Sequence, residues 1–509
     1  MSGTIPMTGV TQQTPFGSTM CINTCVDPIT KQLIPGNIVV NRFGTDINKT
    51  APQQLSFAPN QLKWDTTGPI FPIGGALGAY CDAATPCVTG APDPNYKRPK
   101  AVEWNLDIQR AITSRMTIDV AYVGNHGYDE FGQVDLNAPP LFAGWTAAKV
   151  GPTGTCTSQT IAAATANNAA FKAACKPDAN ALNAARPYNT QFPYLSYVER
   201  STGSLGIFSN YNALQVTVDQ RSFHGLSFLS GYTYSHGLDI SSSVSRGVRQ
   251  MVDPTNPRLT YGSGDNDVRH TFRVSPTWLV PGMKAPAQML EGWSISAILT
   301  LQGRFPYSAL DNRKNDWIGT GETNNTFVSS GVSQYWNFSG PTDAFNSSNV
   351  PIPCYGILAG CAAFASAPAD IQTACNNAAT APYSGNATLQ KLALLSLANN
   401  GCYIQNGGIL TPPAYGTIGN AGKNSFRGPQ YKNVDMSVTK DWHIRERYGA
   451  QFRVEFFNVF NRTNYGAPGS SPTSGGASFG FSQATPDATN AVFGTGGPRH
   501  VQFGLKLTF

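Results

Sequence analysis

The sequence predicts an all-β protein, an antiparallel transmembrane β-barrel of about nine strands with long loops that contain short helices. Three observations predict this fold. Apolar and polar residues alternate with a period of two in successive segments, as in strands with one face towards an apolar environment and the other towards water. These segments are about 9–13 residues long, and a tilted strand needs about 9–11 residues to cross a bilayer. The links between them alternate between short and long.

The expected strands begin as hairpins. Every second residue is apolar in residues 102–109, and a short link leads to the same pattern in residues 116–122. A second hairpin joins residues 214–219 to 226–234. Five more strands are expected at residues 268–279, 293–301, 434–439, 448–456 and 501–509.

The lengths of the links indicate the kind of barrel. Short links are expected at residues 112–115, 222–225, 280–290 and 442–446, and long ones at about 127–208, 237–266, 304–429 and 461–498. Outer-membrane barrels combine short periplasmic turns with long extracellular loops, and soluble sandwiches have no reason to sort their loops this way. Alanine-rich residues 161–185 and 388–399 predict short helices within the loops. We assign residues 1–100 to an extracellular loop region and residues 101–509 to the barrel.

The composition argues against several classes of protein. Only 13% of the 509 residues are charged, and the net charge of +6 forms no basic stripe, so no nucleic-acid partner is expected. No apolar run of about 18 residues predicts a transmembrane helix. The first six residues have neither the basic nor the apolar region of a secretory signal peptide, which conflicts with an outer-membrane destination.

The ten cysteines predict loop disulfides in an oxidising compartment, because they form local groups and show neither a CxxC pair nor zinc-ligand spacing. Free thiols in a cytosolic chain are the weaker alternative. The groups are Cys21 with Cys25, Cys81 with Cys87, Cys156 with Cys175, and Cys354, Cys361, Cys375 and Cys402 together. The last group, which has four members, leaves three connectivities open.

The end of the chain predicts an outer-membrane insertion signal. The last strand has apolar residues at alternate positions and a terminal aromatic residue: Phe503, Leu505, Leu507 and Phe509. We therefore expect the barrel-insertion machinery and outer-membrane lipid as partners. This signal places the C-terminus at the periplasmic side and every long loop outside the cell. Aromatic residues near strand ends fit interfacial girdles: Tyr122, Tyr232, Tyr234, Trp278, Trp293 and Trp442.

No catalytic constellation, metal site or cofactor site is predicted, and the protein is not expected to be an enzyme. His270, which follows Asp267 and Arg269, could suggest a metal or acid–base site, but a polar cluster in the barrel wall is the better interpretation. Charged residues of both signs are expected to face the barrel interior: Glu103, Asp107, Asp119, Asp219, Arg221, Arg453 and Glu455.

Several segments resemble the barrel of Oar-like TonB-dependent outer-membrane receptors, over roughly residue 95 to the end. The segments are residues 102–127, 209–239, 267–272, 292–303, 433–466 and 497–509. The resemblance implies a signal peptide, a carboxypeptidase-regulatory-like domain, a plug and a barrel of about 22 strands. Only the C-terminal part of such a barrel is expected here, so we expect a fragment of the receptor, with TonB reached through the missing N-terminal part.

Three functions follow from these observations. A TonB-dependent receptor would bind a large or complex substrate with its extracellular loops and take it up. A passive porin-like channel would need a complete barrel and a constricting loop. A secreted β-rich adhesin, binding protein or hydrolase would need short strands shielded by a second sheet. We favour the receptor, and the loops do not specify its ligand.

Overall fold

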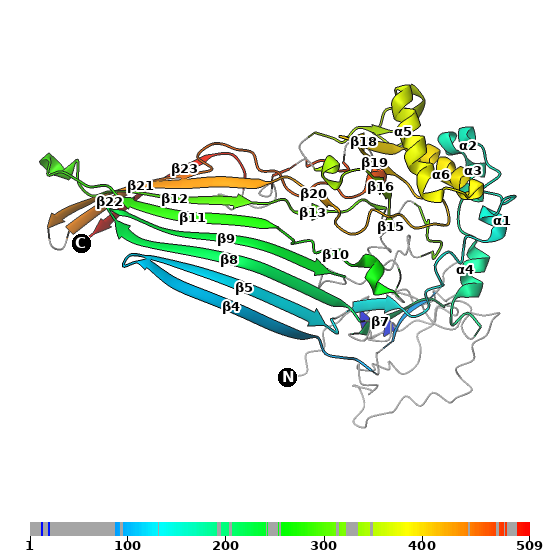
Figure 1. Ribbon diagram of the computed structural model, residues 1–509, viewed down its shortest axis with the longest axis horizontal. Helices are drawn as coiled ribbons and strands as arrows, with labels where there is room; N and C mark the ends of the chain where they lie inside the picture. The colour runs from blue at the N-terminus through cyan, green and yellow to red at the C-terminus, as the bar shows by residue number, and fades with distance from the viewer. Residues whose placement is uncertain are drawn as a thin grey trace, which may run out of the picture.

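Nine long strands form one antiparallel sheet, and the long chain segments that link them gather at one end of it (Figure 1). The computed structural model describes residues 12–13, 19–20, 87–91, 95–130, 132–190, 195–202, 206–240, 242, 253, 256–311, 315–321, 334–346, 350–445, 448–474, 478–482, 484–485 and 496–509. Among these residues, no helix is long and apolar enough to cross a membrane.

The sheet follows the chain from strand to strand in the order β4-β5-β8-β9-β11-β12-β21-β22-β23. Its strands are β4 Lys100–Thr113, β5 Met116–Tyr128, β8 Phe208–Phe223, β9 Leu226–Asp239, β11 His270–Leu279, β12 Trp293–Gln302, β21 Tyr431–Arg445, β22 Tyr448–Phe457 and β23 His500–Thr508. A short strand, β10 (Gly262–Ser263), adds to the end of β9. All nine predicted strands are confirmed. Several are longer than predicted, because the backbone ladder continues beyond the point where apolar residues alternate.

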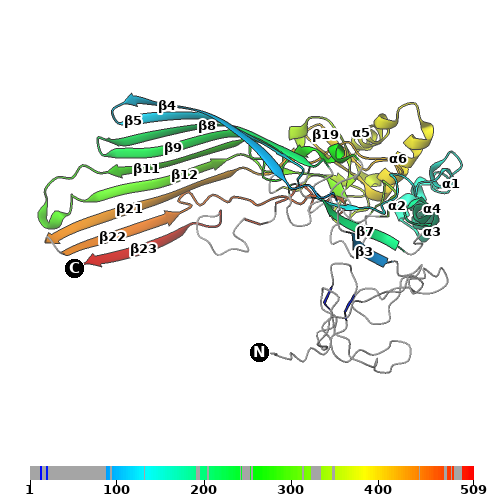
Figure 2. The ribbon, with the colours of Figure 1, turned by 90° about the horizontal axis from the view of Figure 1, so that it is seen from below.

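Two strands lie at the edges of this sheet. Among the described strands, β4 pairs only with β5, and β23 pairs only with β22. The sheet is therefore open over the part of the chain that the structure describes (Figure 2).

The register gives the sheet one polar face and one apolar face. Residues paired directly across antiparallel strands share a face, so Ile108, Val120 and Val216 form one apolar row. The apolar face is not covered by protein: Ile108 is 63% exposed, and Leu505 on β23 is 68% exposed. An uncovered apolar face with strands of bilayer-spanning length is a lipid-facing surface.

The described residues of the long links form a separate body, which we call the cap (the described residues within 129–207, 240–269, 303–430 and 458–499). Its elements include β6 Gly132–Asp135, α1 Ala147–Val150, α2 Ile161–Ala166, α3 Ala169–Ala174, α4 Ala179–Ala185, β7 Leu195–Thr202, β13 Pro306–Tyr307, β14 Leu310–Asp311, β15 Gln334–Tyr335, β16 Asn337–Ser339, β17 Cys354–Tyr355, α5 Ala369–Thr380, α6 Ala387–Asn400, β18 Cys402–Gln405, β19 Gly408–Thr411 and β20 Phe426–Arg427. The predicted loop helices are confirmed by α2, α3, α4 and α6. The helices α1 and α5 were not predicted.

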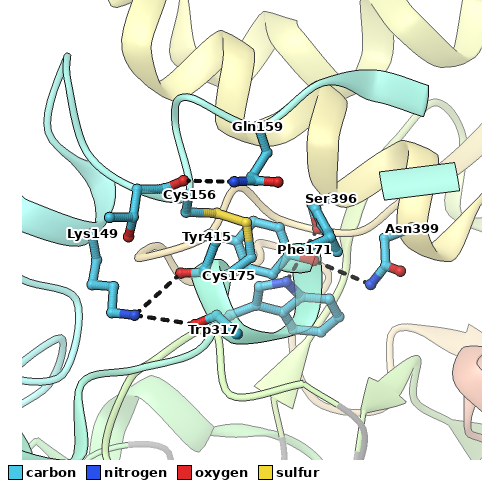
Figure 3. Close-up of a disulfide and its surroundings, with 12 residues drawn as sticks. Lys149, Cys156, Gln159, Phe171, Cys175, Trp317, Ser396, Asn399 and Tyr415 are labelled. Atoms are coloured by element: carbon cyan, nitrogen blue, oxygen red, sulfur yellow. Dashed lines mark hydrogen bonds between the residues drawn. A yellow bond between two sulfur atoms is a disulfide. The ribbon is translucent and has the colours of Figure 1, made fainter. Parts of the chain in front are cut away.

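The cap has its own hydrophobic core. Trp317, Trp336 and Phe345 have no exposed surface, and the Trp317 and Trp336 rings meet edge to face with their centroids 6.1 Å apart. Trp317 Nε1 donates a hydrogen bond to Ser396 Oγ on α6 at 3.2 Å (Figure 3). The cap is therefore held together by side-chain packing as an ordinary globular domain is.

Three disulfides join parts of the cap. Cys156 is bonded to Cys175, next to the buried Tyr415 and Phe171 rings (Figure 3). Of the three connectivities left open in the four-cysteine group, the structure has Cys354–Cys361 and Cys375–Cys402. Cys21, Cys25 and Cys81 lie outside the described residues. Cys87 is placed in β3 (Cys87–Ala91), a strand of the assigned N-terminal region that pairs with β7.

The opposite end of the sheet carries the short links, and we call it the short-turn end. The predicted link at 442–446 is wrong in its start, since β21 continues to Arg445 through an irregularity in its pairing with β22. The link after β11 wraps around Lys440, whose Nζ donates to the carbonyls of Gln288 (2.5 Å) and Glu291. Trp442 and Trp293 present their rings to the same ammonium group, with centroids at 5.0 and 5.7 Å.

Candidate functional site

Residues 423–427, which we call the anchor segment, bind the end of β9 and the link that follows this strand. Lys423 Nζ donates to a carboxylate oxygen of Asp239, the last residue of β9, and to Ser242 Oγ at 3.0 Å. The side chain of Lys423 is only 4% exposed. A charge this deeply buried is stable only when it is paired, so Asp239 holds Lys423 in one position.

Asn424 makes the second attachment. Its Nδ2 donates to the Ser263 carbonyl and to Asp265 Oδ1, both at 2.8 Å, and its Oδ1 accepts from Ser308 Oγ at 2.9 Å. One amide therefore joins the link after β9 to the link after β12.

Arg427 makes the third attachment, to Asp267. Its two terminal nitrogens donate to the Asp267 carbonyl at 2.7 Å and to Oδ2 at 2.8 Å. The Asp267 carboxylate has no exposed surface. Burial by itself would raise the pKa of Asp267, but hydrogen bonds from Arg427, the Gly237 amide and His236 outweigh it and lower this pKa to about 2.

The hydrogen bonds around Asp267 also determine the tautomer of His236. Arg269 Nη2 lies 3.1 Å from His236 Nε2, and a guanidinium can only donate. His236 Nε2 must therefore accept, so the ring proton is on Nδ1, which lies 3.2 Å from Asp267 Oδ1. Because Arg269 Nε also donates to Asp267 Oδ2, at 3.2 Å, the buried carboxylate orients two guanidinium groups.

Two cavities are lined in part by the anchor segment. The first, which we call the basic cavity, has a volume of about 610 Å³ and is lined by Ser263, Arg269, Arg304, Thr342, Asp343, Asn346, Lys423, Asn424, Ser425 and Arg427. Its lining has four cationic side chains and one carboxylate, Asp343. The second, the aromatic cavity, has a volume of about 640 Å³. Its lining includes Phe305, Tyr307, Tyr335, Tyr431 and Tyr465, with Asp265, Asn266, Lys423 and Asn424.

Each cavity is lined by a residue at the cap end of the polar face of the sheet. Tyr431 lines the aromatic cavity and pairs with Gln302, two residues from the Asn433–Thr300 pair on the polar face. Arg269 lines the basic cavity and accepts a backbone hydrogen bond from Ser235, which also belongs to the polar face. A solute in either cavity would therefore lie next to the cap end of the polar face.

Most of the predicted site residues lie away from these cavities. Phe503, Leu505 and Leu507 point out from the apolar face of β23, and Phe509, just beyond the strand, is 95% exposed. Of the residues predicted to face the interior, Glu103 accepts from Asn125 at 3.1 Å, and Arg453 and Glu455 form an ion pair at 3.2 Å.

His270 lies on the apolar face of the sheet, beside two tyrosines. Its Nδ1 is 2.9 Å from Tyr232 Oη, and its ring packs near Tyr234. No group of three potential metal ligands occurs among the described residues. The arrangement supports the interpretation of His270 as part of the barrel wall.

The anchor segment and both cavities were not predicted from the sequence. Asp267 was noted only as a neighbour of His270, and Arg427 lies 160 positions further along the chain. Lys423 and Arg427 lie in a loop rich in glycine and asparagine, and the sequence of this loop has no periodic pattern that would identify their partners.

A lipid-facing antiparallel sheet of long strands, topped by large loops, defines an outer-membrane barrel protein. The chain belongs to the family described as "Outer membrane beta barrel domain", whose model matches residues 29–502. The predicted outer-membrane location is therefore confirmed.

Comparison with solved structures finds outer-membrane transporters and receptors at low similarity. FpvA of Pseudomonas aeruginosa, bound to heterologous pyoverdines, is 10% identical with a TM-score of 0.28, over 81% of this chain and 28% of that one. The outer-membrane transporter YddB of Escherichia coli is 8% identical with a TM-score of 0.32, over 83% and 34%. The ferric enterobactin receptor PfeA of P. aeruginosa is 10% identical with a TM-score of 0.30, over 81% and 31%.

The chain thus spans about a third of the length of these structures. No curated protein sequence matches it.

Proposed function

We propose that the chain is the C-terminal part of an outer-membrane receptor of the Oar-like TonB-dependent type, which binds a solute in the cap and takes it up through the barrel. The observation that carries the proposal is the pair of cavities lined by residues at the cap end of the polar face. The resemblance of the strand segments to Oar-like receptors and the family match support it. No catalytic role is proposed.

The cap supports a receptor because it is already organised for binding. A core of buried aromatic side chains and three disulfides hold the long loops in one arrangement. A site that is rigid before the ligand arrives loses less entropy on binding. A passive channel gains nothing from such a cap.

We also propose that further strands complete the barrel. An open sheet edge in lipid would leave backbone N–H and C=O groups without partners, which costs several kcal/mol for each group. The edges of β4 and β23, which are unpaired within the described part of the chain, must therefore meet each other or further strands, and we favour further strands. The mass of the intact gene product, extracted from outer membranes, tests this expectation, and a product of about 54 kDa would contradict it.

Transport is tested in the bacterium that encodes the chain. The parent, a strain without this gene and a strain without TonB receive a defined mixture of oligosaccharides, peptides and metal chelates, and periplasmic contents are measured by mass spectrometry. A receptor predicts that one solute class accumulates in the parent only. Accumulation that needs this gene but not TonB would favour the porin-like alternative. Equal accumulation in all three strains would favour an adhesin or other binding protein.

A further inference from the structure

We infer that the two cavities together bind an acidic oligosaccharide, with a carboxylate of the sugar in the basic cavity and a sugar ring in the aromatic cavity. The inference names a substrate class for the proposed receptor and rests on that function only for the direction of transport.

The basic cavity has positive charge available for a ligand. Three of its four cations are already paired within the protein, Lys423 with Asp239, and Arg427 and Arg269 with Asp267. Arg304 is different: it is half-buried and makes no hydrogen bond or ion pair with the described part of the chain. A guanidinium group with free donors at the wall of a cavity matches a carboxylate, which it can bind through two parallel hydrogen bonds.

The carboxylates of Asp239 and Asp267 hold the cationic side chains of this cavity in fixed positions. Asp267 fixes Arg427 and Arg269 through charge-assisted hydrogen bonds of 2.8 and 3.2 Å. The single exposed acid of the lining, Asp343, disfavours a highly charged ion and leaves a net attraction for one carboxylate. A ligand with its negative charges spaced along a chain fits better than a compact polyanion.

The aromatic cavity suits a ring that carries hydroxyl groups. Phe305 is 36% exposed, and Pro429 and Pro468 line the same cavity, so an apolar ring face has a surface to contact. Asp265 is exposed there and has one carboxylate oxygen without a partner in the described chain. A carboxylate accepts hydrogen bonds and donates none, so it favours a ligand with hydroxyl donors over a plain aromatic anion.

The two cavities are connected through shared residues. Lys423 and Asn424 line both of them. Arg304 lines the basic cavity and the next residue, Phe305, lines the aromatic cavity. The carboxylate-binding group and the ring-binding surface are therefore one residue apart, which is a spacing that a single sugar acid or two adjoining sugar units can span.

The test uses the full gene product, purified from outer membranes in detergent, and isothermal titration calorimetry at low salt. The probes are trigalacturonate, its methyl ester and inorganic phosphate. We expect trigalacturonate to bind, the ester to bind roughly tenfold more weakly because it has lost the charges that Arg304 pairs with, and phosphate to show no measurable binding.

Three variants locate the site. Arg304→Gln should weaken trigalacturonate roughly tenfold and leave the ester unchanged, and it spares the anchor segment because Arg304 has no partner there. Phe305→Ala should weaken the acid and the ester by a similar factor. The matched control is Arg462→Gln, which removes an exposed arginine that lines neither cavity, and it should change nothing.

Equal affinity for the acid and the ester, or full affinity in Arg304→Gln, would overturn the inference. Binding of phosphate as tight as that of trigalacturonate would show an anion site without a sugar subsite and would overturn it too. TonB-dependent uptake of another solute class, with no trigalacturonate binding, would leave the receptor function intact and refute only the substrate class. Binding of trigalacturonate without TonB-dependent uptake would support the binding site and refute the receptor function.

Discussion

In the sheet, large apolar side chains point outward, whereas in the cap they point inward. Leu106 on β4 is 64% exposed and Phe503 on β23 is 69% exposed, but Trp317 and Trp336 in the cap have no exposed surface. The sheet is held together by its backbone ladder and by the lipid around it. The cap, in contrast, is held by a packed core and by disulfides. One chain therefore uses its apolar residues in two ways, and each region should respond to a different kind of change.

The largest effect is expected from Trp336→Ala in the cap core. The indole contacts the rings of Trp317 and Tyr403, and its loss should destabilise the cap by about 3–5 kcal/mol. Limited proteolysis in a urea series measures the cap, and far-ultraviolet circular dichroism measures the sheet. We expect the cap to be cleaved at lower urea while the β signal is unchanged. Ile161→Ala, at an exposed position on α2, is the control.

A charge on the lipid face should have the next largest effect. Val216 lies at the middle of β8 between Val120 and Tyr232, and Val216→Arg should destabilise the sheet in lipid by about 2–4 kcal/mol. Gln215→Arg, one residue away on the polar face, should cost far less. Urea unfolding in lipid vesicles measures both variants. The assignment of the two faces would be refuted if Gln215→Arg proved to be the more damaging change.

Acid should loosen the junction between the two regions. Asp267 has a folded pKa of about 2, below its usual value near 4, so its carboxylate stabilises the fold fully above pH 4, and this contribution is lost as the pH falls from 4 to 2. The loss amounts to about 2 kcal/mol. The stability of the wild type and of Asp267→Asn, followed from pH 6 to pH 2, should differ by less at pH 2. A difference that does not depend on pH would contradict this role.

The sequence predicted the sheet far better than the cap. Strand β12 could be predicted because every second residue from Trp293 to Leu301 is apolar, as expected when one face of a strand contacts lipid. The helix α5 has no comparable stripe, since its chain is rich in alanine and asparagine and only Cys375 and Ala379 are buried. Every strand faces the same lipid, so one sequence pattern identifies all of them. A loop residue instead packs against another loop, and its own sequence does not show which one.

The candidate site was beyond prediction for the same reason. The contact between Asp267 and Arg427 joins two cap segments, and the contact between Lys423 and Asp239 joins the cap to the end of β9. Each partner looks like an ordinary solvated loop residue when it is read alone. Only the local cysteine groups indicated contacts within the loops, and even they left the pairing of Cys354, Cys361, Cys375 and Cys402 open.

Lys440 and its cage have a consequence for the thickness of membrane that suits the protein. On the lipid-facing row of β21, Lys432 and Lys440 enclose Val434, Met436 and Val438. Eight residues of strand cover roughly 26 Å, and a tilt of about 40° reduces this to roughly 20 Å across the bilayer. That is less than the usual hydrocarbon depth, and the ammonium group of Lys440 is held by backbone carbonyls instead of reaching towards the headgroups, so the strand suits a thin bilayer. The bacterial outer membrane is thinner than average, and β21 is matched to such a membrane by the spacing of two charges.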